Sequence, residues 1–160
     1  YRELYRKGLT GEELGALIAK MELEDPYSIQ GVLDTSAWAR TGTVGPTVGE
    51  SLVRAGHKLR RADKNRIQGK IQIHEYLRVQ QSGRPRLQIF NTCPNLIREL
   101  QGIPLDKNNP EDVDTHAPDH AYDALRYLIM SRPRVQDSFS RIRNLHLEQA
   151  YTPADSEFGY

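Results

Sequence analysis

Short apolar segments alternate with longer amphipathic segments over the first 130 residues, and this pattern predicts strands alternating with helices. Four segments read as strands: the end of a strand at residues 1–5, a buried strand at 29–33, an edge strand at 57–60 and a further strand at 86–90. This alternation indicates an α/β fold with a largely parallel or mixed sheet, covered by helices on both faces.

Helix signals lie between and after these strands. Thr10 begins the first helix, with the capping-box pattern Thr10-Gly11-Glu12-Glu13. Further helices are predicted at residues 48–55, 65–81 and 93–100, and from Asp119 onward. On the 65–81 helix we expect five side chains on or near the inner side: Ile67, Ile71, His74, Tyr76 and Leu77.

The regular pattern decays after Arg132-Pro133. We therefore predict one domain at residues 1–132 and a C-terminal extension at 133–160 that is partly helical or flexible. The extension carries a weak amphipathic pattern at 135–150, and residues 151–160 are typical of a flexible tail.

Composition excludes several classes of protein. No apolar run reaches the length of a membrane span, and the chain does not begin with a signal peptide. Cys93 is the single cysteine, which excludes an internal disulfide and fits a reducing compartment. We expect Cys93 to be a buried small residue rather than a nucleophile, because no base lies near it in the sequence.

The net charge of +1 conceals two segments of opposite charge. Residues 51–90 carry ten Lys or Arg against two acids, whereas residues 99–123 carry seven acids against one lysine. A basic segment can bind the phosphates of a nucleic acid and an acidic pocket can hold cations, although both can also be solvated faces. The expected phosphate contacts are Arg60, Arg61, Lys64, Arg66 and Lys70.

Three side chains that can bind a metal lie at the start of the last predicted helix. Asp119, His120 and Asp123 follow Pro118 at spacings that put Asp119 and His120 next to Asp123 on the helix surface. Hard divalent ions prefer carboxylate oxygens, and a histidine among the ligands favours Mn²⁺ over Mg²⁺. Two alternatives remain: Asp119 is equally suited to cap the helix, and His120 can be a surface histidine. Arg126 can contact DNA or pair with a neighbouring acid.

Asp34 is the second candidate acid, because it lies at the carboxyl end of the predicted strand at 29–33. Ligands of open α/β sheets gather at such strand ends. An Asp-Thr-Ser segment after a strand is also a common helix N-cap, so a catalytic role for Asp34 requires that it meet Asp123 in space. Trp38, four residues later, is expected to be a packing anchor, with stacking on a DNA base as the alternative.

An ordered set of motifs over residues 1–130 resembles the C-terminal nuclease domain of the large terminase subunit of tailed bacteriophages or prophages. The motifs are Gly31-Val32-Leu33-Asp34-Thr35-Ser36-Ala37-Trp38, the basic segment 64–69, Phe90-Asn91-Thr92-Cys93-Pro94-Asn95, and the acidic segment 111–114 leading into 119–127. Each motif is weak alone, and their order and spacing carry the resemblance.

The resemblance implies a ribonuclease-H-like fold and an endonuclease that cuts concatemeric viral DNA during genome packaging in the cytoplasm of the bacterial host. Carboxylates of that family bind two divalent metal ions, Mg²⁺ or Mn²⁺. Asp34 corresponds to the second acid, Asp123 to the last acid and His120 to the ligand one turn earlier, with Asp119 as a supporting ligand. The implied partners are double-stranded DNA, an ATPase domain in the full-length protein, the small terminase subunit and the portal.

One part of the family pattern lies outside this chain. The first carboxylate of the family normally sits on the opening strand of the sheet, before the strand that residues 1–5 resemble. We therefore expect an opening hairpin that is either missing or part of a longer polypeptide. These residues contain no Gly-x-x-x-x-Gly-Lys-Ser/Thr motif, so they do not include the packaging ATPase. The alternatives are a catalytically silent DNA-binding or docking module of the packaging motor and a resolvase-type nuclease.

Overall fold

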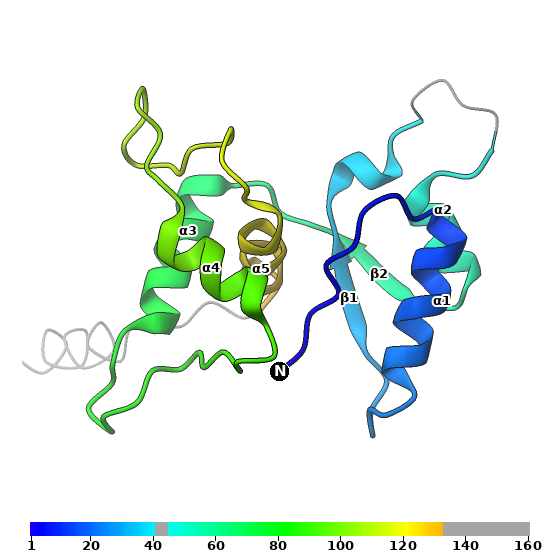
Figure 1. The fold of residues 1–160 in the computed structure, drawn as a ribbon, viewed down its shortest axis with the longest axis horizontal. Helices are drawn as coiled ribbons and strands as arrows, with labels where there is room; N and C mark the ends of the chain where they lie inside the picture. Colours follow the sequence, from blue (N-terminus) through cyan, green and yellow to red (C-terminus); the bar gives the residue numbers. More distant parts are fainter. Residues whose placement is uncertain (41–44, 133–160) are drawn as a thin grey trace, which may run out of the picture.

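The computed structural model describes residues 1–40 and 45–132 (Figure 1). The predicted extension at 133–160 lies outside the described residues. Helices and strands follow one another in the order α1 (Gly11–Glu22), β1 (Gln30–Leu33), the 3-10 helix η1 (Thr35–Trp38), α2 (Val48–Arg54), β2 (Lys58–Arg61), α3 (Arg66–Leu77), α4 (Pro94–Gly102) and α5 (His120–Met130).

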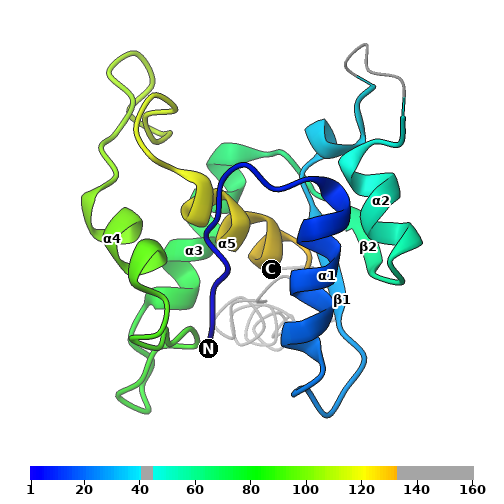
Figure 2. The ribbon, with the colours of Figure 1, turned by 45° about the vertical axis from the view of Figure 1, so that its right-hand side comes forward.

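The two strands form a small parallel sheet between two groups of helices. β1 pairs with β2 in register, with Gly31 opposite Leu59. α1 and α2 pack together on one side of the strands, and α5 contacts β1 from the other side (Figures 1 and 2). The predicted α/β class and the parallel pairing are confirmed.

Two of the predicted strands are wrong. Residues 1–5 and 86–90 lie outside any strand of the described residues. An extended segment becomes a strand only where a neighbouring chain supplies backbone hydrogen bonds. Residues 1–5 are instead held through side chains, among them Glu3, which accepts hydrogen bonds from the N–H groups of Asn95 and Leu96 on α4. Residues 86–90 are attached to α3 instead, where the N–H of Leu87 donates to the carbonyl of Tyr76 at 2.9 Å.

Three of the predicted helix starts are confirmed by their caps. Thr10 and Thr47 both complete capping boxes, and the side chain of Asn65 accepts from the N–H of Gln68 at 3.0 Å. α2 is followed by Gly56 at φ +96°, a left-handed conformation that suits glycine at a helix end. α3 is shorter than predicted, because the chain turns after Leu77.

The core lies between α3, α4 and α5. Its buried residues are Ile73, Val113, Tyr122, Leu125 and Ile129. The inner side expected for α3 is wrong for four of its five residues: Ile67, Ile71, His74 and Leu77 are exposed, and only Tyr76 is partly buried. The buried residues of α3 are Gly69 and Ile73. The reason is that α3 presents Gly69 to the side chain of Arg126 on α5, and this contact sets the rotation of the helix.

Candidate functional site

Asp34 and Asp123 converge on the hydroxyl of Tyr127. Asp34 follows β1 directly, and Asp123 and Tyr127 lie one turn apart on α5. The Tyr127 hydroxyl donates to Asp34 Oδ2 and also lies 3.3 Å from Asp123 Oδ2. The two carboxylates, 89 positions apart in the sequence, are therefore separated by a single hydroxyl group.

Asp34 is held in its ionised form. Its Oδ1 accepts from the N–H of Ser36 at 2.5 Å and lies 3.5 Å from Lys64 Nζ. Partial burial opposes ionisation, but the hydrogen bonds from Ser36 and Tyr127 and the charge of Lys64 outweigh it and hold the pKa of Asp34 far below its usual value. Asp34 thus caps η1 with one oxygen and faces Tyr127 with the other. Burial and the Asp34 carboxylate raise the pKa of the Tyr127 hydroxyl, which stays protonated.

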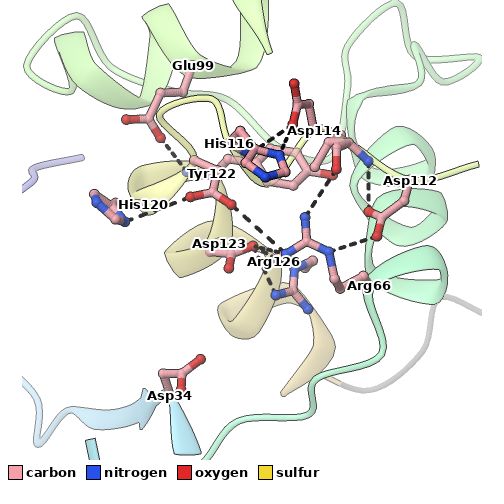
Figure 3. A network of polar contacts seen from close by, with 12 residues as sticks. Asp34, Arg66, Glu99, Asp112, Asp114, His116, His120, Tyr122, Asp123 and Arg126 are labelled. Carbon is pink, nitrogen blue, oxygen red and sulfur yellow. Dashed lines mark hydrogen bonds and ion pairs between the residues drawn. The ribbon is translucent and has the colours of Figure 1, made fainter. Parts of the chain in front are cut away.

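Two arginines surround Asp123. Arg126 contacts Asp123 Oδ1 through Nε at 3.0 Å and Nη2 at 2.9 Å, so Arg126 forms an ion pair with its neighbouring acid. Arg66 on α3 lies 3.7 Å from the same oxygen and 4.0 Å from Asp119, while its Nε donates to Asp112 at 2.8 Å (Figure 3). Asp123 is therefore neutralised within the protein.

Arg126 is fitted tightly between α3 and α5. Its side chain is 2 % exposed, and a Cβ at Gly69 would meet its Cδ at 2.7 Å. Its Nη1 is buried and has no hydrogen-bond partner among the described residues. Because Arg126 has no room to move, it fixes the position of the Asp123 carboxylate.

Asp119 occupies the N-cap position of α5 but does not cap it. Glu99 on α4 accepts the hydrogen bonds from the N–H groups of Ala121 and Tyr122 instead. The side chain of Asp119 is 15 % exposed. Burial and the nearby Asp123 carboxylate raise the pKa of Asp119, and Arg66 opposes this only in part.

His120 does not join Asp34 and Asp123. Its side chain is 77 % exposed, and its Nδ1 lies 3.8 Å from Asp119 Oδ1. In Figure 3 it lies apart from Asp123, Arg126 and Asp34. It lines a pocket of about 720 Å³ between residues 1–8, residues 87–89 and one face of α5.

The residues present fit a hard divalent cation only in part. Asp34 and Asp123 offer converging carboxylate oxygens, which suit Mg²⁺ or Mn²⁺. Among the described residues, however, no group of three or more His, Cys, Asp or Glu side chains is assembled as a metal site. Lys64, Arg66 and Arg126 also compete with a cation for these carboxylates. The pair fits one cation, and the ligand set for a second one is not assembled in the described part of the chain.

The five basic residues expected to contact phosphate fall into two groups. Arg60 and Arg61 on β2 and Lys64 just after it are exposed, and Lys64 reaches Asp34. Arg66 is engaged with Asp112, and Lys70 Nζ donates to the carbonyls of residues 110 and 111 at 3.2 and 3.0 Å. Of the five, Lys64 is the one that contacts Asp34, and Arg60 and Arg61 are exposed on β2 just before it.

Trp38 and Cys93 are packing residues, as expected. A Cβ at Gly49 would meet the Trp38 ring at 2.6 Å, and the guanidinium of Arg61 lies over that ring at 5.3 Å. These contacts occupy the ring, which favours packing over stacking on a base. Cys93 is 3 % exposed.

Sequence reasoning missed Tyr127 and Glu99. Tyr127 was open to prediction, because it lies four residues after Asp123 and so shares its helix face. Glu99 gave no such signal, because its partners on α5 lie 22 and 23 positions away.

Comparison with models of protein families, with curated proteins and with solved structures finds no match to this chain. Of the helices in residues 1–40 and 45–132, none is both long enough and apolar enough to cross a membrane.

Proposed function

We propose that this chain is a metal-dependent DNA endonuclease domain of the terminase large-subunit type, with a ribonuclease-H-like fold. The observation that carries the proposal is the convergence of Asp34 and Asp123 on the Tyr127 hydroxyl, at the carboxyl end of β1. Because strand ends are where α/β sheets bind ligands, this pair is the best-placed acidic site of the described residues.

Each residue of the site has its own role in the proposed reaction. Asp34 and Asp123 supply oxygen ligands, and Tyr127 holds the two carboxylates toward each other. Arg60, Arg61 and Lys64 bind the DNA phosphates beside Asp34. When bound, divalent cations activate a water molecule and stabilise the leaving oxygen of the phosphodiester. Because His120 lies outside the pair, the ligands of the pair are carboxylate oxygens, and these suit Mg²⁺ as well as Mn²⁺.

The family resemblance puts its first carboxylate on an opening strand before residues 1–5. An Asp-x-Gly-like turn encoded upstream of Tyr1 would add that carboxylate to Asp34 and Asp123.

The proposal extends to the partners of such a domain. They are an ATPase domain in the same polypeptide, the small terminase subunit and the portal, with concatemeric double-stranded DNA as substrate in the bacterial cytoplasm.

The test is nicking of supercoiled plasmid by the purified chain in Mn²⁺ or Mg²⁺. Asp34→Asn and Asp123→Asn should each reduce nicking to the level of a reaction with chelator. Glu24→Gln is the matched control, because the Glu24 side chain is 86 % exposed and its ion-pair partner is Arg2 rather than a residue of the site. Nicking that persists unchanged in both Asp variants would exclude this site.

The second candidate is a catalytically silent DNA-binding or docking module. It is favoured by the neutralisation of Asp123 by Arg66 and Arg126. Absence of nicking together with retained, salt-sensitive DNA binding would support the module. A resolvase-type nuclease would instead cut branched DNA in preference to linear duplex.

A further inference from the structure

α1 lies against α2 through two glycines (Figures 1 and 2). A Cβ at Gly11 would meet the Cβ of Ser51 at 2.7 Å, and a Cβ at Gly15 would meet the Cβ of Ala55 at 3.0 Å. Gly15 is also the one residue of α1 that is buried. Because a contact between glycines buries little apolar side-chain area, polar contacts contribute a large share of what holds α1 in place.

The polar contact at the end of α1 is made by His57, which lies just before β2. The His57 ring is buried, with 5 % of the side chain exposed. Its Nε2 lies 2.9 Å from the carbonyl oxygen of Gly15, and its Nδ1 lies 3.2 Å from Glu22 Oε2. Both ring nitrogens therefore face oxygens of α1, one near the middle of the helix and one at its last residue.

Both of these oxygens are acceptors, and this fixes the protons on the His57 ring. A backbone carbonyl and an ionised carboxylate can only accept, so each ring nitrogen has to carry a proton. A neutral imidazole has one N–H, whereas the imidazolium ion has two. Since glutamic acid is ordinarily a stronger acid than imidazolium by about two pH units, the additional proton belongs on His57 and Glu22 stays ionised.

Glu22 is the charged group that pairs with His57 among the described residues. β1 carries no titratable side chain. The other charged residues of α1, α2 and β2 either contact other partners (Glu12, Glu13, Glu50, Lys58 and Arg61) or are exposed (Lys20, Arg54 and Arg60). The protonation of His57 therefore depends on Glu22 and on burial of the ring.

We propose that His57 and Glu22 form a pH-sensitive clasp that holds the C-terminal half of α1 against α2 and β2. With His57 protonated, both ring nitrogens donate and the clasp is closed. Loss of the Nδ1 proton leaves two acceptors facing each other, so Glu22, whose side chain is 32 % exposed, turns to solvent. The last turn of α1 is then released as the pH rises, while the glycine contacts with α2 remain. The clasp does not depend on the nuclease function proposed above.

The experiment is an NMR titration of the purified chain from about pH 5.5 to about pH 8.5. The ¹⁵N shifts report the protons on the histidine rings, and hydrogen exchange reports the backbone amides of residues 19–22. In the native chain these amides should lose protection about tenfold, beyond the intrinsic effect of pH on exchange, as His57 loses its Nδ1 proton. Glu22→Gln removes the charge and supplies an amide that donates to a neutral Nδ1. In this variant His57 should bind its proton about tenfold more weakly, and the protection of residues 19–22 should stay constant.

Glu12→Gln is the matched control. Glu12 is a carboxylate of the same helix, but it accepts from Ser51 Oγ at 2.9 Å and faces no histidine. This variant should leave the titration of His57 and the protection of residues 19–22 as in the native chain. The exposed His74 is an internal reference and should titrate identically in the native chain and both variants.

Either of two results would overturn the inference. One is an equal proton affinity of His57 in the native chain and in Glu22→Gln. The other is constant protection of residues 19–22 across the titration of the native chain. The second result needs no variant, so the inference stays testable whether or not Glu22→Gln folds.

Discussion

Tyr127 on α5 donates its hydroxyl hydrogen bond to Asp34 at the end of β1, and the same hydroxyl lies 3.3 Å from Asp123. This contact joins the end of the sheet to the last described helix through polar groups. Because the pKa of the hydroxyl is raised and that of Asp34 is lowered, the donor and the acceptor both keep their roles at neutral pH.

Tyr127→Phe should lower the free energy of unfolding by about 1.5–3 kcal/mol, the usual value for a hydrogen bond to a charged group. The ring remains, so packing is preserved and the loss reports the hydroxyl. Urea unfolding measures it. Tyr122→Phe is the control, because Tyr122 is buried on the same helix and its hydroxyl has no hydrogen-bond partner among the described residues. Similar losses in the two variants would contradict the role of the Tyr127 hydroxyl.

Stability should fall in acid through Asp34. The pKa of Asp34 is lower in the folded chain than its usual value of 3.8, so the unfolded chain binds a proton more readily. The stability that Asp34 contributes is therefore fully present above about pH 5 and is lost as pH falls toward the lowered folded pKa. Urea unfolding from pH 7 to pH 3 should show a flatter dependence in Asp34→Asn than in the native chain. Glu24→Gln should retain the native slope, and an unchanged slope in Asp34→Asn would argue against an ionised, stabilising Asp34.

Gly69→Ala should destabilise the fold although alanine favours helices. The added Cβ would lie against Arg126 Cγ and Cδ, and the tightly packed guanidinium would leave Asp123. We expect a loss of about 1–3 kcal/mol from overpacking, larger than the gain of about 1 kcal/mol in helix propensity. Gly102→Ala at the end of α4 is the matched control, since a Cβ there has nothing within 4 Å. A stabilising Gly69→Ala would show that Arg126 can be displaced freely.

DNA binding should depend on salt through the residues beside Asp34. Replacing Arg60, Arg61 or Lys64 by Gln should each reduce the slope of log affinity against log salt by about 0.9, the value for one lost phosphate contact. Arg66→Gln should leave that slope unchanged and reduce stability, because Arg66 pairs with Asp112 inside the protein. Fluorescence anisotropy of a labelled duplex over a salt series distinguishes the two effects. If only Arg66→Gln reduced the slope, the DNA-binding surface would lie at α3 rather than beside Asp34.

Much of the local structure was determined by the sequence itself. Thr10, Thr47 and Asn65 cap their helices from positions that the side chains alone indicate, because capping acts over three residues. The strand before Asp34 and the Asp119–Asp123 spacing on one helix turn are equally local features. Such features depend on neighbours along the chain, so a sequence pattern is enough to predict them.

Tertiary structure alone decided which residues meet. It brought Asp34 to Asp123 through Tyr127, turned His120 toward the pocket, and gave the cap of α5 to Glu99 rather than to Asp119. It also left residues 1–5 and 86–90 without strand partners among the described residues. These outcomes depend on groups far apart in sequence whose positions are fixed by helix packing, above all by Arg126 against Gly69, and no local pattern encodes that packing.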